Sequence, residues 1–210
     1  MQQANRKTYH RGNVRDDLVI AARDVLHNEG LAALSLRRVA REVGVAPSAV
    51  YNHFRNREAL LAAVAADGYR QLSRLERDSY DGTQRSPEVL LTLSRRYLRF
   101  ASENPSLYRL MFSPEVVDYR TDPELAEAGE SSFGLSVDWW YGQGAYAATP
   151  RAREHPLALS VWAIMHGLAM QVIDGLVSIN RNDSAALDRL AEQTMQTLIQ
   201  GLEEPLSKKP

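Results

Sequence analysis

Residues 35–54, SLRRVAREVGVAPSAVYNHF, decide the fold of the N-terminal part of this chain. Apolar residues recur with a helical period after Ser35, which is a good N-cap for the short helix that they predict. Gly44 ends that helix after about two turns, because glycine readily adopts left-handed backbone. Pro47 then suits the first turn of a second short helix, which we expect to reach about Phe54.

A longer helix is expected on either side of this stretch. Over residues 14–28 the apolar side chains fall on one helical face, and Gly30 follows as a stop. Asn56 is a good N-cap for a helix that we expect over roughly 57–80. Two short helices joined by a glycine turn, with the small Ala40 where they cross, are typical of a helix-turn-helix motif.

The outward face of the second short helix is small and polar, which suits the major groove of DNA better than a protein core. Asn52 can pair bidentately with adenine, and the methyl group of Ala49 can contact a thymine methyl group. Tyr51, His53 and Arg57 can donate hydrogen bonds to phosphates. Arg55 is a further candidate for such a contact. The predicted DNA-contacting residues are Arg37, Pro47, Ser48, Ala49, Tyr51, Asn52, His53 and Arg57.

Three patterns in this region resemble the N-terminal domain of the TetR/AcrR family of bacterial repressors. They are L-R-x-V-A-x-x-x-G-V at Leu36–Val45, Y-x-H-F at Tyr51–Phe54, and the helix start Arg57-Glu58-x-Leu60. The resemblance covers about residues 9–66, with the three patterns in register. Ala46 departs from it, because the family often has Ser or Thr there, and loss of such a cap costs a helix about 1 kcal/mol.

The remainder of the chain also has a helical pattern, with longer elements separated by Pro and Gly breakers. The stretch 113–130 is acidic and contains prolines, so we interpret it as a mobile connection or a poorly packed helix start. Residues 204–210 are expected to fray. No strand pattern is evident, so we expect an all-α fold. The further helices are expected at roughly 87–102, 105–112, 123–140, 155–180 and 184–203.

The C-terminal part resembles the WHG-type ligand domain that some of these regulators contain. The matching residues are Asn104-Pro105, Leu107-Tyr108, Met111-Phe112, and Trp162 with His166-Gly167. The resemblance implies an all-helical bundle that binds a small molecule and dimerises through its last two helices. We therefore expect a helix-turn-helix DNA-binding domain at 9–70 and a ligand-binding and dimerisation domain at 71–210.

His166 lies four residues after Trp162, on the same helical face. Either both side chains line an effector pocket, where the histidine gives a polar contact, or they belong to the core. Other aromatic and Met side chains could line a hydrophobic pocket, although such stripes are more often simple core. The candidate effector-binding residues are Tyr97, Phe100, Tyr108, Met111, Phe112, Trp162, Met165, His166 and Met170.

Three other segments have two interpretations each. The run Trp139-Trp140-Tyr141 either covers a pocket or anchors an interface, or it pins a chain reversal. The apolar faces of the helices near 157–176 and 184–203 either pack within the chain or form a four-helix dimer interface. A dimer would set two recognition helices about 34–36 Å apart, as a pseudopalindrome requires. Arg6, Lys7 and Arg11 form either an arm along DNA or a solvated tail.

Composition restricts the class of protein further. The chain has 210 residues, 44% of them hydrophobic and 24% charged, which excludes wholesale disorder. Residues 1–60 contain 10 Lys/Arg and 6 Asp/Glu, a balance of +4, whereas the remainder has 25 − 10 = 15 and 26 − 6 = 20, a balance of −5. A basic head on an acidic body suggests that only the head meets a polyanion, although chance also produces such an asymmetry.

The absence of certain residues and segments indicates the cellular compartment that we expect for this protein. Cysteine is absent, which excludes disulfides and cysteine-ligated metals and permits a reducing cytoplasm. Neither a run of about 18 apolar residues nor a secretory signal is evident, so we expect a cytoplasmic protein without a membrane partner.

These patterns together predict a ligand-responsive transcriptional repressor. It would bind a pseudopalindromic operator in double-stranded DNA as a homodimer, and a small hydrophobic effector would release it. A transcriptional activator of the same fold is the alternative, and a helical module that docks protein is a third. Motifs for nucleotide binding or for a hydrolase nucleophile are absent, so no enzyme is expected. The five histidines lack metal-ligand spacing, so neither a metal nor a cofactor is expected.

Overall fold

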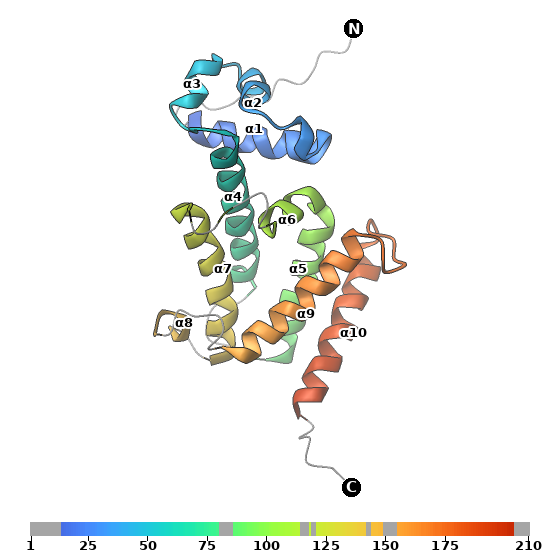
Figure 1. Ribbon diagram of the computed structural model, residues 1–210. Coiled ribbons are helices and arrows are strands. Elements are labelled where there is room, and N and C mark those ends of the chain that lie inside the picture. Colours follow the sequence, from blue (N-terminus) through green and yellow to red (C-terminus); the bar gives the residue numbers. More distant parts are fainter. Residues whose placement is uncertain are drawn as a thin grey trace. The chain divides into compact units, whose positions relative to one another are not determined.

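The computed structural model describes residues 14–79, 86–113, 118, 121–141, 144–148 and 155–203, and within these ranges it contains helices and no strand. The all-α prediction is therefore confirmed. In chain order the helices are α1 (Val14–Glu29), the 3-10 helix η1 (Leu31–Ala33), α2 (Leu36–Val43), α3 (Pro47–Tyr51), α4 (Arg57–Arg77), α5 (Pro87–Glu103), α6 (Pro105–Met111), α7 (Pro123–Tyr141), α8 (Ala145–Ala148), α9 (Pro156–Ile173) and α10 (Ser184–Glu203) (Figure 1).

The chain forms two compact units. The first comprises residues 1–68 together with Ser106–Ala126, and the second comprises Tyr69–Pro105 together with residues 127–210. Both α4 and α7 therefore contribute residues to each unit. α6 and the start of α7 are grouped with the N-terminal helices. The division into compact units therefore does not coincide with a single chain boundary near residue 70. The functional domains at 9–70 and 71–210 stay a prediction.

In the first unit, α1 packs against α2 and η1. Leu18, Ala22 and Leu26 lie on one face of α1 and are almost completely buried, as the helical period predicts. α6 packs closely on the middle of α4, because a Cβ atom added at Gly68 would lie 2.6 Å from the Sδ atom of Met111. Glycine at this position lets the two backbones approach, and Tyr108 is fully buried beside them.

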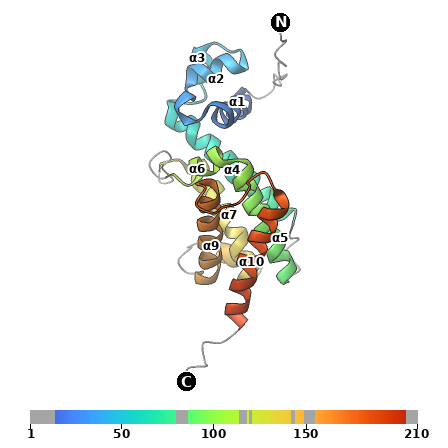
Figure 2. The same ribbon diagram turned by 90° about the vertical axis from the view of Figure 1, so that its right-hand side faces the viewer.

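In the second unit, α5 is the central helix, and both α9 and α10 pack against it. Figures 1 and 2 show α9 and α10 running in opposite directions. Leu98 and Ala101 of α5 are fully buried. At the edge of this packing the Nε atom of Arg99 donates to Asp188 of α10 at 2.6 Å, and Arg95 pairs with Glu192 one turn along.

Predicted helix ends agree where a capping group was recognised. Ser35 accepts a hydrogen bond from the backbone N–H of Arg38, and Asn56 accepts one from Ala59. The expectation that α3 lacks a side-chain cap is also confirmed, since Ala46 precedes Pro47 at its start.

Three predicted helix ends were wrong. α3 stops at Tyr51, and Phe54 is buried beyond its end. α4 ends at Arg77, short of the expected 80. α9 ends at Ile173, because Gly175 adopts a φ of 72° and the backbone N–H of Leu176 turns back to the carbonyl of Gln171.

Leu176, expected on the apolar face of α9, consequently lies past the helix with 76% of its surface exposed. α8, a short helix within 142–150, was not predicted at all.

The start of α7 is better packed than the sequence suggests. Asp122 caps α7 by accepting from the backbone N–H of Leu125, which is fully buried, and Arg15 pairs with Glu124. The interpretation of this helix start as mobile or poorly packed was therefore wrong from Pro123 onward. Residues 114–117, 119–120 and 204–210, on which related expectations fell, lie outside the described residues.

α9 is long and apolar enough to cross a membrane by length and composition alone, with a mean hydropathy of 1.5 and 33% of its residues buried. The sequence analysis missed it because Ser160, His166 and Gln171 interrupt the apolar run without lowering its mean hydropathy enough. One such helix is weak evidence for a membrane span, since the core helix of a soluble bundle meets the same criterion.

Gly44 provides a direct test of the turn. Its φ is 79°, and a Cβ atom added there would meet nothing within 4 Å, so any cost of a side chain comes from the backbone. We expect Gly44→Ala to lower the free energy of unfolding by about 1–2 kcal/mol, measured by urea denaturation. Gly44→Asn should lose less, because Asn tolerates left-handed backbone. Equal stability of Gly44→Ala and the unmodified protein would contradict the assignment.

Candidate nucleic-acid interface and effector site

The corner between α2 and α3 is fixed by backbone geometry. The backbone N–H groups of Gly44 and Val45 both donate to the carbonyl oxygen of Ala40, at 2.9 and 3.0 Å. Ala40 and Val50 are fully buried on the inner side of this corner. A larger residue than Ala40 would separate the helices, so the corner holds α3 at one angle against α2. This is the helix-turn-helix arrangement that the spacing predicted.

With Val50 facing inward, the rest of α3 and its C-terminal end face outward. Tyr51 has 55% of its surface exposed, and Ala49 is half-buried. Arg37 is exposed in the first turn of α2. The remaining predicted contact residues, Pro47, Ser48, Asn52 and His53, are exposed as well. The structure therefore brings the predicted set together on one part of the first unit, with Arg57 the exception.

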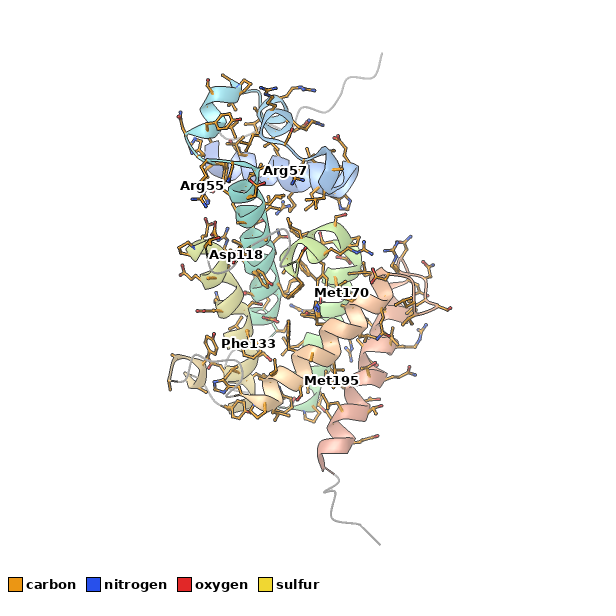
Figure 3. All side chains as sticks on the ribbon, viewed as in Figure 1. Arg55, Arg57, Asp118, Phe133, Met170 and Met195 are labelled. Carbon is orange, nitrogen blue, oxygen red and sulfur yellow. The ribbon has the colours of Figure 1, made fainter. Side chains whose placement is uncertain are left out.

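The guanidinium group of Arg57 is directed inward. Its Nε atom donates to the carbonyl of Leu34 at 2.8 Å, and its Nη2 atom donates to the carbonyl of Leu31 at 2.7 Å. Arg57 is half-buried, and Figure 3 shows it beside the start of α4. It thus ties α4 to the segment after α1. The sequence analysis assigned this side chain to phosphate contact alone and missed its structural role.

Three further arginines of the first unit are paired with carboxylates of the protein. Arg38 lies between Glu29 and Glu42, and hydrogen bonds to these two carboxylates raise its pKa above the ordinary value. Arg23 pairs with Asp67 at 2.7 Å. Arg15, besides pairing with Glu124, lies over the ring of Phe54 at 5.3 Å. These side chains stabilise the unit and are less available to DNA.

Arg37, Arg41 and Arg55 differ from these arginines. Each is exposed, and none makes an ion pair or side-chain hydrogen bond with any residue that the structure describes. Arg37 lies in the first turn of α2, Arg41 lies in its last turn, and Arg55 lies after the end of α3. Arg55 and Arg57, both labelled in Figure 3, are two residues apart in the chain, but Arg55 is exposed whereas Arg57 is half-buried and bonded to backbone carbonyls. Arg41 was overlooked, and only the three-dimensional pairing of its neighbours distinguishes it.

The nine candidate effector-binding residues do not all fall in one compact unit. Phe112 is half-buried and lies 4.8 Å, centroid to centroid, from the buried ring of Tyr108. In the second unit, Tyr97, Phe100 and Met165 are buried. Tyr108, Met111 and Phe112 belong to the first unit, whereas Tyr97, Phe100, Trp162, Met165, His166 and Met170 belong to the second. Whether they line one pocket stays a prediction.

The pair Trp162 and His166 forms as the spacing predicts. Their rings are stacked at 5.2 Å and 20° between planes, and burial lowers the pKa of His166, which favours its neutral form. Phe133 of α7 meets Trp162 edge-on at 6.5 Å and Tyr146 of α8 at 6.1 Å. The sequence analysis named neither Phe133 nor Tyr146, because their proximity to α9 depends on how the bundle packs.

The aromatic residues Trp139, Trp140 and Tyr141 at the end of α7 lie on different sides of the helix. Trp139 is buried, Trp140 meets it edge-on at 4.5 Å, and Tyr141 is exposed. The hydroxyl oxygen of Tyr141 accepts from the backbone N–H of Leu157 at 3.2 Å. This bond links the end of α7 to the first turn of α9. It agrees with the interpretation in which the aromatic run holds down a chain reversal.

Family comparisons agree with this geometry. The model of the "Bacterial regulatory proteins, tetR family" matches residues 18–64, and that of the "Tetracyclin repressor-like, C-terminal domain" matches residues 90–198, about half of the chain. The chain belongs to the TetR family. The predicted family is thus confirmed, and the protein is a DNA-binding transcription regulator with a helix-turn-helix motif. The WHG subtype of its C-terminal domain stays a prediction.

Solved structures show the same TetR fold over nearly the whole chain. A Rhodococcus protein of unknown function is 26% identical, with a TM-score of 0.67, and the match covers 91% of this chain and 98% of that one. The fatty acid degradation regulator FadR from Bacillus halodurans is 17% identical, with a TM-score of 0.64 and coverage of 94% and 100%. The TetR family regulator PfmR from Thermus thermophilus is 16% identical, with a TM-score of 0.59 and coverage of 89% and 99%.

The inward position of Arg57 predicts a stability effect that Arg55 lacks. Arg57→Ala leaves two backbone carbonyls without their charged donor, so we expect a loss of about 2 kcal/mol in the free energy of unfolding. Arg55→Ala should change it by less than about 0.5 kcal/mol, as is usual for surface positions. Urea denaturation of both variants measures the difference. Similar stability of the two variants would show that the Arg57 bonds do not hold the unit together.

Proposed function

We propose that this TetR-family protein is a ligand-responsive transcriptional repressor. It binds a pseudopalindromic operator as a homodimer through the exposed residues of α2 and α3. A small effector with an apolar body, bound in the second unit, shifts the protein toward a state that releases the operator. Such a shift requires that the effector bind the two states with different affinity. The protein acts in the cytoplasm, where its DNA is.

The observation that carries the proposal is the combination of an exposed polar helix and unpaired arginines around it. Asn52 offers an amide that matches the edge of adenine, and Ser48 and Ala49 allow close approach to the groove. Arg37, Arg41 and Arg55 provide positive charge that no carboxylate of the described residues neutralises, and phosphate groups of DNA can pair with it. This arrangement supports sequence-specific contact with DNA, with Arg57 holding the domain instead of contacting phosphate.

Selection from a pool of random duplex DNA tests the proposal. At about 150 mM salt, nonspecific phosphate binding is weakened, so retained sequences report specific contacts. We expect a pseudopalindrome whose half-sites repeat at about one helical turn. Recovery of no motif by folded protein from which denaturation releases no bound small molecule would contradict the proposal.

Binding of variants to the selected operator then distinguishes residues that contact bases from residues that contact phosphates. Asn52→Ala should weaken binding by about 1–3 kcal/mol and relax the preference at one base pair. Arg55→Ala should weaken operator and random DNA alike and lower the salt dependence by about one unit of slope. Arg74→Ala, which removes an exposed charge of the second unit, serves as the control. If all three variants bound alike, the interface would lie elsewhere.

The dimer is proposed to form through α9 and α10. Two-thirds of α9 is not buried within the chain although the helix carries no charged residue, and Ile164 has 37% of its surface exposed. An apolar face of this extent is covered in many oligomers by a second copy. Gly167 lies one turn beyond Ile164, and a Cβ atom added there would meet nothing within 4 Å, which leaves room for a close approach.

We therefore expect Ile164→Glu to weaken self-association at least tenfold, measured by analytical ultracentrifugation, because it places a charge in the proposed interface. Ile20→Glu is the matched control, since Ile20 of α1 is also 37% exposed but lies in the first unit. It should leave the association constant unchanged. A dimer of normal affinity in Ile164→Glu would place the interface on another surface.

A further inference from the structure

A polar pair lies within the buried stripe of α4. Tyr69, Leu72 and Ser73 are each at most 6% exposed, and Glu76 continues the same face one turn after Leu72 and Ser73. The Oγ atom of Ser73 and the Oε2 atom of Glu76 are both buried, and neither has a hydrogen-bond partner within the described part of the chain. The stripe that packs this helix into the second unit thus ends in two unsatisfied oxygen atoms.

Such a pair is unfavourable for stability alone. A buried carboxyl group without a partner disfavours its charged form, and burial raises the pKa of Glu76 to about 8 although the neighbouring Arg77 acts in the opposite direction. A leucine or glutamine would serve a purely structural role better. Unsatisfied buried groups in a native protein require an explanation, and recognition of a ligand is one.

The nearby arginines do not supply the missing counter-charge. The Nη2 atom of Arg77 donates to the Oγ atom of Ser131 on α7 at 3.3 Å. Arg96 of α5 donates to the backbone carbonyl of Leu75 at 3.2 Å, and Arg95 pairs with Glu192 of α10. Each of these three guanidinium groups is therefore engaged with another group, and none of them pairs with the carboxyl group of Glu76.

An aromatic cluster lies in the same compact unit as this end of α4. Phe133 of α7, which Figure 3 labels, meets the ring of Trp162 edge-on at 6.5 Å. Phe133, Trp162 and His166 are all half-buried. Aromatic faces attract ammonium groups within about 6 Å, and neutral histidine does not repel them.

We propose that Ser73 and Glu76 are the polar recognition point of the effector site, and that the effector carries a protonated amine on an apolar or aromatic body. An ammonium group has several N–H donors, so it can satisfy the Oγ atom of Ser73 and the carboxylate of Glu76 together. It also neutralises the buried charge. This inference rests on the proposed function and names the class of ligand that the second unit takes.

Binding then releases a proton. Below about pH 8 the carboxyl group of Glu76 is mostly protonated in the unliganded protein, and the ammonium group stabilises its ionised form. The amine keeps its own proton, so the proton lost by Glu76 passes to the buffer. A ligand that contacted only apolar residues of the bundle would release no proton on binding.

Calorimetric titration of the full-length protein at pH 7.0 tests this with 4-phenylbutylamine as the probe. The neutral 4-phenylbutanol and the anionic 4-phenylbutanoate serve as ligands of matched shape. We expect the amine to bind at least tenfold more tightly than either. Repetition in two buffers of different ionisation enthalpy should give close to one proton released per amine bound. No binding of the amine, or equal binding of amine and alcohol, would overturn the inference.

Two variants separate recognition from folding. Glu76→Gln keeps the shape of the side chain and should bring the amine to the affinity of the alcohol, with no proton released. Its thermal midpoint at pH 8 should equal or exceed that of the unmodified protein, because the unfavourable carboxyl group is gone. Glu127→Gln, an exposed position of α7, should change neither measurement. Retained amine preference in a folded Glu76→Gln variant would exclude Glu76 as the anchor.

Failure of this inference is distinguishable from failure of the proposed function. Recovery of an operator by a protein that does not discriminate the amine would leave the repressor proposal in place and exclude the cationic effector. Tight, proton-linked binding of the amine that left operator affinity unchanged would establish the binding site and contradict the ligand-responsive mechanism.

Discussion

The corner at Gly44 is the constraint on which the functional surface depends. The carbonyl oxygen of Ala40 accepts both following backbone N–H groups, and this geometry exists only because Gly44 takes left-handed backbone. It turns the chain so that Val50 enters the core. Once Val50 is buried, the helical period leaves Ser48, Tyr51 and Asn52 outward. One residue's backbone therefore orients the surface that we propose contacts DNA.

Charge in the first unit is divided between holding the fold and binding a partner. Arg57 fixes α4 to the segment after α1, and Arg38 links the end of α1 to α2 through two carboxylates. Among the described residues, Arg37, Arg41 and Arg55 make no such pair, and we propose that they contact phosphate. The net charge of the N-terminal part is thus a poor guide to its interface, because Arg15, Arg23 and Arg38 are paired with carboxylates of the protein, whereas Arg37, Arg41 and Arg55 form no such pair with a described residue.

In the second unit, by contrast, the Oε2 atom of Glu76 and the Oγ atom of Ser73 are buried without a hydrogen-bond partner in the described part of the chain. Arg77 of α4 is bonded to α7, and Arg96 and Arg95 of α5 are bonded to a backbone carbonyl and to α10. Because these neighbouring arginines are engaged elsewhere, the two unsatisfied oxygen atoms of α4 are informative. The paired arginines hold the helices of the bundle together, whereas we propose that Ser73 and Glu76 bind a ligand.

The sequence by itself determined what is local. Helical periods, the caps at Ser35 and Asn56 and the turn at Gly44 depend on neighbouring residues, so they fixed the all-α fold, most helix ends and the exposed face of α3. The ends of α3 and α9 were wrong because a competing backbone turn, such as that at Gly175, has no periodic signature. Only the tertiary structure decided which charges are paired. Arg57 with Leu34, Arg77 with Ser131 and the absence of a partner at Glu76 depend on distances between helices far apart in the chain, which no local pattern encodes.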